Sequence, residues 1–216
     1  ISPPSSNVVN QAGNETTNIT NWVNALTPGL PTNQGSSYAV ADCGWKYMFD
    51  KYNNTYRWIP LNGDIAGLCA KTDIEKDPWF SPGGLNRGQI RNVVKLSWNP
   101  TKTERDTLYV KGINPVVTFQ GEGTVLFGDK TLLSRPSAFD RINVRRLMIF
   151  LKKEVSRIAA RLLFSPNVEV TWNTFLGQVN PLMASVKTRF GLDDYKVILD
   201  KTTTTPDLVD QNIMYA

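Results

Sequence analysis

Residues 137–164 read SAFDRINVRRLMIFLKKEVSRIAARLLF, the longest stretch of the chain with regularly spaced apolar side chains. Successive residues of an α-helix are turned by about 100°, so this stretch has two faces. An apolar arc typical of a helix packed on a core carries Val144, Leu147, Met148, Leu151, Val155, Ile158 and Leu162. The opposite side carries seven basic residues, Arg141, Arg145, Arg146, Lys152, Lys153, Arg157 and Arg161. The pattern predicts one long amphipathic helix, capped at Ser137 and Asp140, with an exposed basic face that Glu154 interrupts.

The basic residues are concentrated in the central third of the chain. The 216 residues include 24 Lys or Arg and 19 Asp or Glu, a net charge of +5. Residues 81–163 carry 15 basic and 6 acidic side chains, a net charge of +9, whereas residues 1–80 and residues 164–216 each have a net charge of −2. This distribution indicates a basic surface with an acidic partner. A solvated basic face without a partner is the alternative that charge alone leaves open.

The chain has no histidine and two cysteines, Cys43 and Cys69. A Ser-His-Asp triad, a Cys-His dyad and a zinc site with a His ligand are therefore excluded within this chain. The cysteines are interpreted as free thiols of a reducing compartment, with a single bridge as the alternative. No apolar run approaches the ~18 residues of a membrane span, so we expect no membrane insertion.

A phosphate-binding loop is the nearest match to a cofactor motif, and it fails. Gly123 and Gly128 have the spacing of such a loop, and a Lys-Thr pair follows. Asp129 stands between Gly128 and that pair, which shifts the register and places a carboxylate where a phosphate would bind. We therefore expect no cofactor and no metal, and no constellation of residues predicts an enzyme.

Turn residues, caps and alternation predict the remaining elements. Residues 1–37, rich in Ser, Asn, Thr, Pro and Gly, are expected to be loop or extended chain with a short turn at 22–26. Residues 38–61 alternate like a strand pair, and their aromatic row from Trp45 to Trp58 is assigned to the domain core rather than to base stacking. The other predicted elements are a short buried helix at 64–71, helices at 89–98, 101–111 and 171–190, strands at 115–119, 124–127 and 195–200, and a helical turn at 206–210. Thr101 and Glu104 are expected to form a capping box at the start of the 101–111 helix, which Gly112 ends, and Pro181 is expected to kink or split the 171–190 helix.

Three classes of function are compatible with a long basic helix in a chain without histidine. The chain is a subunit of an ordered assembly that docks on an acidic protein surface, a nucleic-acid binder, or a domain of an enzyme whose catalytic part lies elsewhere. Nucleic-acid binding predicts glycine or aromatic residues between the basic ones, and this face has none. The assembly subunit is therefore favoured, with a basic-helix nucleic-acid-binding protein as the alternative.

Several long motifs of the sequence resemble contractile tail sheath proteins of bacteriophages. They are GWKYMFDKYNNTYRWIPLNGDIAGLCAKTD (44–73), PWFSPGGLNRGQI (78–90), VLFGDKT (125–131), PSAFDRINVRRLMIFLKKEV (136–155) and LDKTTTTPDLVDQN (199–212). They occur in the order of the family, and the resemblance covers residues 38–212. Residues 1–37 are expected to add nothing to it.

The resemblance implies a mixed α/β and α+β fold in three parts. Residues 1–37 would be a loop or extended segment, and residues 38–115 part of a subtilisin-like α/β domain without protease activity. Residues 116–216 would be a C-terminal α+β domain that lacks its final strands, with the long basic amphipathic helix packed on a small sheet. The chain would then be part of a longer protein.

The resemblance also implies a structural role in the virion, after assembly in the host cytoplasm. Family members stack as hexameric rings in a helical sheath around the inner tail tube, and contraction drives the tube through the host envelope. The implied partners are other copies of the chain, the tail tube protein, and the baseplate and tail terminator proteins, with no nucleic acid. The basic residues Arg141, Arg145, Arg146, Lys152, Lys153, Arg157 and Arg161 would contact the tube or a neighbouring subunit. Asp140 and Arg141 are open to either a local pair or an intersubunit role.

Overall fold

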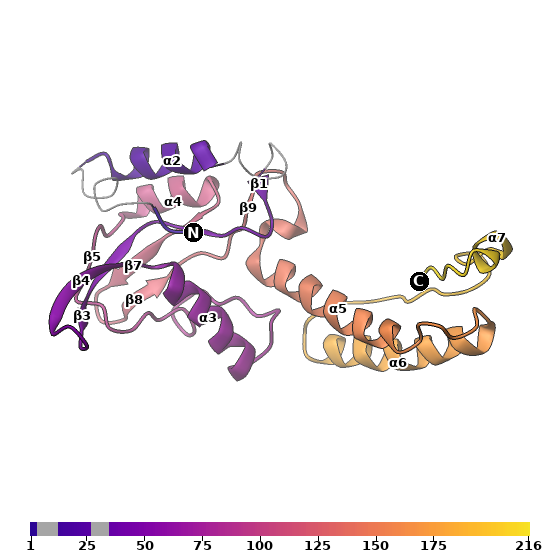
Figure 1. The fold of residues 1–216 in the computed structure, drawn as a ribbon. Coiled ribbons are helices and arrows are strands. Elements are labelled where there is room, and N and C mark those ends of the chain that lie inside the picture. The colour runs from indigo at the N-terminus through magenta and orange to yellow at the C-terminus, as the bar shows by residue number, and fades with distance from the viewer. Residues whose placement is uncertain (4–12, 27–34) are drawn as a thin grey trace. The chain divides into compact units, whose positions relative to one another are not determined.

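The computed structural model describes residues 1–3, 13–26 and 35–216 and shows a mixed α/β structure (Figure 1). The chain divides into two compact units. Unit 1 comprises Ile1–Arg146 and unit 2 comprises Leu147–Ala216. Every helix in the described residues is too short or too polar to span a membrane.

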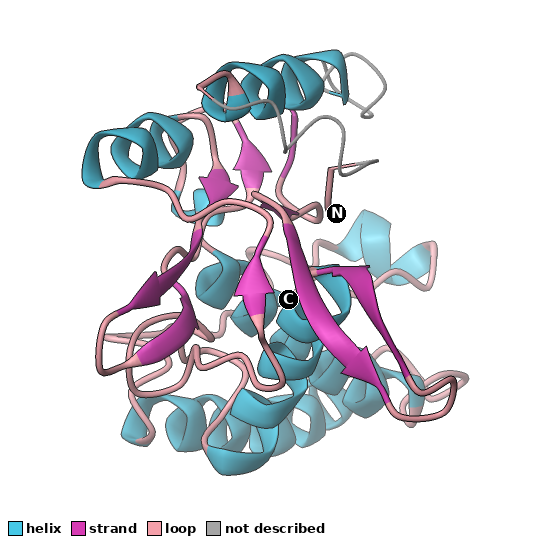
Figure 2. Cartoon of the chain, turned by 90° about the vertical axis from the view of Figure 1, so that its left-hand side faces the viewer, coloured by secondary structure: helices cyan, strands magenta, loops and turns pink. Residues whose placement is uncertain are grey.

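The strands of unit 1 form four small sheets in the part of the chain that the structure describes (Figure 2). The largest is antiparallel with the order β4-β3-β5, β2 and β6 form a parallel pair, β7 and β8 form a hairpin, and β1 pairs antiparallel with β9. The strands are β1 (Gly35–Ser36), β2 (Ala41–Asp42), β3 (Trp45–Asp50), β4 (Thr55–Pro60), β5 (Lys95–Leu96), β6 (Ile113–Asn114), β7 (Val116–Phe119), β8 (Gly123–Leu126) and β9 (Leu132–Leu133). The predicted strand pair within 38–61 and the strands near 115–119 and 124–127 are confirmed.

Three helices pack around these sheets: α2 (Glu15–Leu26), α3 (Asn62–Glu75) and α4 (Lys102–Val110). Helices α2 and α4 lie side by side, as both ribbon views show (Figures 1 and 2). The core between helices and sheets consists of Ile19, Val23, Ala41, Cys43, Leu61, Ile65, Leu68, Ile90, Leu108, Ile113, Val116, Leu126 and Leu132. Burial of these apolar side chains is the main source of stability of unit 1.

A buried asparagine joins strands that are distant in sequence. The Asn114 side-chain amide donates hydrogen bonds to the carbonyl oxygens of Ala41, at 3.0 Å, and Lys130, at 2.8 Å. Its Oδ1 atom accepts a bond of 2.7 Å from the backbone N–H of Lys130. A buried amide is tolerated because its hydrogen bonds are made, and here it ties the parallel pair to the chain that leads into β9.

The ends of α4 are as predicted from its sequence. Thr101 and Glu104 form a reciprocal capping box at the N-terminus, with the Glu104 carboxylate accepting the backbone N–H of Thr101 at 2.7 Å. Gly112 follows the helix with a φ of +75°, a left-handed conformation that glycine adopts without a steric penalty. Helix α3 runs from Asn62 to Glu75 and is longer than the short helix predicted at 64–71.

The prediction of loop or extended chain throughout 1–37 is wrong, because α2 occupies Glu15–Leu26. Ile19 and Val23 lie four residues apart on one face of this helix and are buried in the core of unit 1. Ile19, Trp22, Val23 and Leu26 follow the i, i+3, i+4, i+7 spacing of an amphipathic helix, a signal that the prediction did not use. The predicted turn at 22–26 is the last part of α2, and residues 4–12 and 27–34 of the predicted segment lie outside the described residues.

The helix predicted at 89–98 is also wrong. Lys95–Leu96 form strand β5, which pairs with β3, and Gln89 makes an antiparallel bridge to Val125. Asn92 has a φ of +56°, which interrupts any helix. The backbone of this segment is therefore fixed by pairing with strands from elsewhere in the chain.

The aromatic row of the β3–β4 hairpin lies outside the core, contrary to the prediction. Phe49 is 43% exposed and Tyr56 is 52% exposed, whereas Lys46 on the opposite face of β3 is buried. The Lys46 ammonium donates to Asp64 Oδ1 at 2.8 Å and to the Arg91 carbonyl at 3.2 Å. Because a strand has two faces, alternation indicates the period correctly but does not show which face is buried.

The long basic segment begins with a short 3₁₀ turn, η2 (Ala138–Asp140), and continues as α5 (Ile142–Ala160). The Ser137 hydroxyl accepts the N–H of Phe139 at 3.3 Å, so the predicted cap is present but belongs to η2. The predicted helix is confirmed over most of 137–164. Its last predicted turn differs, because Phe164 has a φ of +68°.

Unit 2 pairs the later part of α5 with α6 (Glu169–Thr188), and α7 (Pro206–Asp210) follows. Trp172, Phe175 and Val179 of α6 form a core with Leu199. Val155, Ile158 and Leu162 from the predicted apolar arc pack against this core, whereas Met148 is 41% exposed. Residues 147–216, all described, contain no strand, so the packing of the helix on a small sheet is not seen within unit 2 and stays a prediction.

The remaining predictions about unit 2 have different outcomes. The helix predicted at 171–190 is confirmed as α6, which continues through Pro181 as a single helix, and the predicted turn at 206–210 is α7. The strand predicted at 195–200 is absent, because no other segment of the described chain pairs with it.

The two units do not coincide with the predicted segments 1–37, 38–115 and 116–216. The structural division falls between Arg146 and Leu147, inside α5. The predicted boundary between a subtilisin-like domain and a C-terminal domain, after residue 115, is a separate question and stays a prediction.

Candidate protein-interaction surface

The seven basic residues predicted to form one face fall into two groups. Arg141, Arg145 and Arg146 belong to unit 1, and Lys152, Lys153, Arg157 and Arg161 belong to unit 2. The first group makes contacts within the chain. The second group is exposed to solvent.

Arg141 is held by a network of acidic and aromatic side chains. Its guanidinium lies 2.8 Å from Asp129 Oδ1 and 3.5 Å from Asp140 Oδ1, and it donates a hydrogen bond to the Tyr109 hydroxyl. The hydrogen bond that Arg141 donates to the Asp129 carboxylate raises the pKa of Arg141, and burial raises the pKa of Tyr109. Asp140 also pairs with Lys130 at 3.1 Å, so its contacts are local.

Arg145 lies between two aromatic rings of unit 1. Its guanidinium carbon is 4.3 Å from the ring centroid of Tyr38 and 4.1 Å from that of Phe139. It donates a hydrogen bond of 2.5 Å to the Ser37 hydroxyl. A planar guanidinium stacked on aromatic faces and bonded at its edge is an arrangement that lysine cannot reproduce.

Arg146 connects the start of α5 to α3. Its guanidinium donates to the Cys69 carbonyl at 3.1 Å and forms an ion pair with Asp73. The Arg146 side chain is 18% exposed, and its second terminal nitrogen is buried without a partner. The three arginines together fix the beginning of α5 to unit 1, and we refer to Arg141, Arg145 and Arg146 as the arginine clip.

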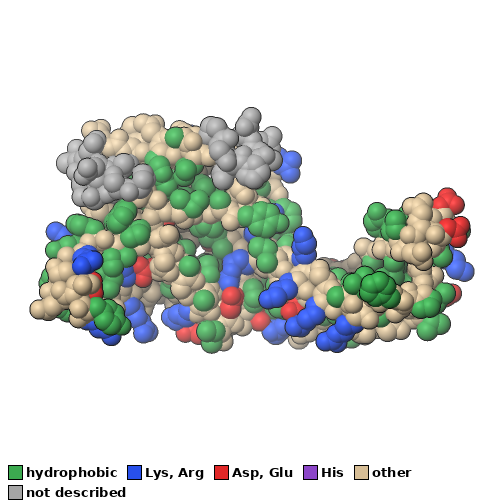
Figure 3. All heavy atoms as spheres, in the orientation of Figure 1, with side chains coloured by type: hydrophobic (Ala, Val, Ile, Leu, Met, Phe, Trp, Pro, Cys, Tyr) green, Lys and Arg blue, Asp and Glu red, His purple; other side chains and the backbone are tan. Residues whose placement is uncertain are grey.

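The other four basic residues, Lys152, Lys153, Arg157 and Arg161, form what we call the exposed basic face. Figure 3 shows blue side chains gathered over the middle of α5. Arg157 pairs with Glu154, three residues before it, while Lys152, Lys153 and Arg161 make no ion pair in the described chain. Such exposed charges are available to an external partner.

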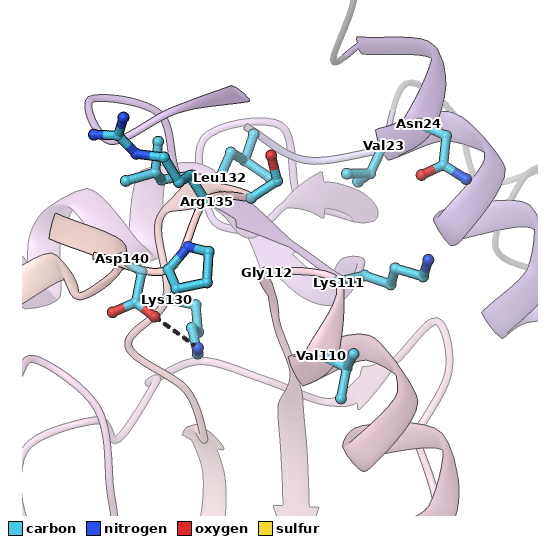
Figure 4. A pocket seen from close by; sticks show the side chains of 12 residues that line it. Val23, Asn24, Val110, Lys111, Gly112, Lys130, Leu132, Arg135 and Asp140 are labelled. Carbon is cyan, nitrogen blue, oxygen red and sulfur yellow. Dashed lines mark hydrogen bonds and ion pairs between the residues drawn. The ribbon is translucent and has the colours of Figure 1, made fainter. Parts of the chain in front are cut away.

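A hollow of about 740 Å³ lies beside the arginine clip, within unit 1 (Figure 4). Its lining includes Lys130 and Asp140, which face each other as an ion pair, and Arg135, whose guanidinium points away from that pair. The charges of Lys130 and Asp140 neutralise each other, whereas Lys111 and Arg135 of the lining make no ion pair in the described chain. Among the described residues, no group of three or more His, Cys, Asp or Glu side chains is arranged to hold a metal ion.

The two cysteines are unbridged, as predicted. Cys43 is buried, and its Sγ atom accepts the backbone N–H of Val116 at 3.2 Å. Burial raises the pKa of Cys43 to about 12 and also raises the pKa of Cys69. Neither thiol therefore has the lowered pKa of a nucleophile at neutral pH.

Comparison with known proteins places this chain in a family. Residues 3–132 match the family model described as the phage tail sheath protein central domain. The chain belongs to the phage tail sheath proteins. Since the match begins at residue 3, the expectation that residues 1–37 add nothing to the resemblance is wrong.

Curated tail sheath proteins match almost the whole chain. The tail sheath protein of Vibrio phage KVP40 is 45% identical over 219 residues, which is 98% of this chain and 33% of the relative. That of Enterobacteria phage T4 is 44% identical over 197 residues, or 90% of this chain and 30% of the relative. This sheath chain therefore spans about a third of the length of the curated relatives it matches.

Solved structures of contractile injection systems have the same fold. A chain in the baseplate of the anti-feeding prophage superposes with a TM-score of 0.75 at 22% identity, covering 92% of this chain and 60% of that one. A chain in the contracted PVC sheath complex gives a TM-score of 0.74 at 21% identity, covering 84% and 51%. At this identity the likeness concerns the fold alone.

Proposed function

We propose that this chain is part of a structural subunit of a contractile tail sheath, without enzymatic activity. Copies would stack as hexameric rings in a helical sheath around the inner tail tube, and contraction would drive the tube through the host envelope. The identity of 38–45% to curated tail sheath proteins along nearly the whole chain supports this role most directly.

The partners follow from the same role. They are other copies of the chain, the tail tube protein, and the baseplate and tail terminator proteins. The subunit would assemble in the host cytoplasm and become part of the virion. Residues 38–115 would belong to a subtilisin-like domain without protease activity, and residues 116–216 to the C-terminal domain.

The exposed basic face is the part of the chain that we assign to the tail tube. Lys152, Lys153 and Arg161 have no described ion pair, whereas the arginine clip is occupied within unit 1. Exposed ion pairs contribute only about 0–1 kcal/mol each, so several weak pairs would hold the sheath to an acidic tube surface and still release on contraction.

Electron microscopy of the full-length protein tests the proposed function. We expect striated tubes or rings from the protein alone, or a regular coat when isolated tail tubes are added at low salt. Raising the ionic strength from about 0.05 to 0.5 M should weaken tube coating, because exposed charges are screened. Dispersed particles that also fail to coat tubes at low salt would contradict the proposal, and nucleic-acid binding by the basic face would then be measured.

A further inference from the structure

Arg105 of α4 is held in place by aromatic rings and has no acidic partner. Its guanidinium carbon lies 5.4 Å from the ring centroid of Phe119 and 5.8 Å from that of Phe127. One terminal nitrogen donates a hydrogen bond of 3.2 Å to the Pro100 carbonyl. Within the part of the chain that the structure describes, no carboxylate forms an ion pair with Arg105, which distinguishes it from Arg141 and its acidic network.

The aromatic contacts fix the Arg105 guanidinium without neutralising its charge. The rings of Phe119 and Phe127 also contact each other, with centroids 5.2 Å apart. Contact with ring faces orients a guanidinium and leaves N–H groups at its edge free to donate. A planar guanidinium in this state is suited to a carboxylate, which it can bind through two parallel hydrogen bonds. Little side-chain entropy would be lost on binding, because the side chain is already ordered.

The guanidinium lies at a hollow with apolar walls. In unit 1, a hollow of about 610 Å³ is lined by Tyr109, Pro115 and Phe127 together with Arg105 and Gly83. Phe127 is 44% exposed, so an aromatic surface is available to a partner. A cavity of about 150 Å³ is sufficient for a benzene ring, so a large apolar side chain fits beside the cation.

The charges around this hollow favour an acidic partner. Lys102, one turn before Arg105, is exposed, lines the hollow and makes no ion pair in the described residues. Asp129 of the lining is paired with Arg141 at 2.8 Å, which leaves Asp106 as its unpaired carboxylate. Two unpaired cations therefore face one unpaired anion, and the lining has a net positive charge. Such a potential attracts a carboxylate and repels a basic segment.

We propose that this hollow binds a segment of a partner protein in which a carboxylate stands next to a large apolar side chain. The carboxylate accepts hydrogen bonds from Arg105 and is attracted by Lys102, and the apolar side chain covers Phe127 and Pro115. Both features are needed, because a bare anion leaves the apolar wall in water and an uncharged apolar segment leaves the guanidinium unpaired. The proposal concerns unit 1 alone and is independent of the assignment of the exposed basic face to the tube.

Binding of short labelled peptides to the full-length protein, measured by fluorescence anisotropy, tests the chemistry of the partner. The probe is a capped Gly-Ser-Asp-Phe-Ser-Gly peptide, and its matched controls replace Asp by Lys or Phe by Ala. Each replacement should weaken binding at least tenfold, because one removes the charge-assisted bond and the other the apolar anchor. Equal binding of either control, or no binding of the probe at about 1 mM, would overturn the proposal.

Substitutions on α4 test the position of the site. Arg105→Lys should weaken binding of the probe about tenfold, because an ammonium group has neither the stacking nor the fork of the guanidinium. Lys102→Glu should also weaken it, and this exposed position keeps the test valid if Arg105→Lys unfolds the protein. Lys111→Glu, an exposed charge reversal at the other end of α4 and outside this hollow, is the matched control and should bind the probe normally.

Photo-crosslinking identifies the surface that the probe covers. A benzoylphenylalanine in place of the peptide Phe should label the segment that contains Tyr109 or the one that contains Phe127. Equal affinities of the Lys102→Glu and Lys111→Glu proteins for the probe would overturn the proposal. Labels confined to other parts of the protein would also overturn it.

Discussion

The beginning and the later part of α5 both carry basic residues, but the surroundings of these residues differ. The arginine clip forms ion pairs with Asp129 and Asp73, a hydrogen bond with Ser37 and contacts with nearby aromatic rings. In the exposed basic face, Lys152, Lys153 and Arg161 have no ion pair in the described chain. A helical wheel places all of these residues on one side of the helix. The difference shows that only some of the basic residues on one face of a predicted helix remain available to a partner once the chain has folded.

Substitution of the stacked arginine should have the largest effect on stability. Arg145→Ala removes two cation–π contacts and the bond to Ser37, and it leaves Tyr38 and Phe139 without their packing partner. We expect a loss of about 2 kcal/mol in the free energy of unfolding, measured by urea denaturation of the full-length protein. An unfolding curve like that of the wild type would show that the clip does not stabilise unit 1.

Arg146 should contribute less than Arg145. Arg146→Ala removes one ion pair and one bond to the Cys69 carbonyl, but Asp73 is 42% exposed and water can solvate it afterwards. We expect a destabilisation of about 1 kcal/mol in the same urea measurement. Arg146→Lys should recover only part of it, because an ammonium group does not reproduce both contacts of the guanidinium. Full recovery of the free energy of unfolding with lysine would show that only the positive charge of Arg146 contributes to stability.

The structure of a segment could be predicted from the sequence where the residues that fix it lie close by in the chain. The helix of α5, the capping box at Thr101 and the stop at Gly112 were correct, because the residues that decide them lie within a few positions. The segment 89–98 was wrong because its backbone is fixed by β3 and by Val125. The buried Lys46 could not be predicted, since its partner Asp64 is placed by α3.

The same limit applies to the candidate surface. The sequence identified all seven basic residues but did not separate them, because Asp129, Asp73 and Ser37 approach α5 only in the folded chain.

The smallest effect on stability is expected in the exposed basic face. Lys153→Ala should change the free energy of unfolding by less than about 0.5 kcal/mol, because the side chain is solvated and makes no ion pair in the described residues. The measurement is the one used for the arginine clip, so the two halves of α5 are compared directly. A loss as large as that of Arg145→Ala would remove the distinction between them.

Coating of isolated tail tubes by the variant Lys152→Glu/Lys153→Glu tests the central claim most directly. Lys201→Glu, at another exposed position of unit 2, is the matched control for charge reversal. We predict that the double variant unfolds like the wild type but fails to coat tubes at low salt, while the Lys201→Glu protein coats them normally. Normal extended sheaths from the double variant would contradict the assignment of this face to the tube.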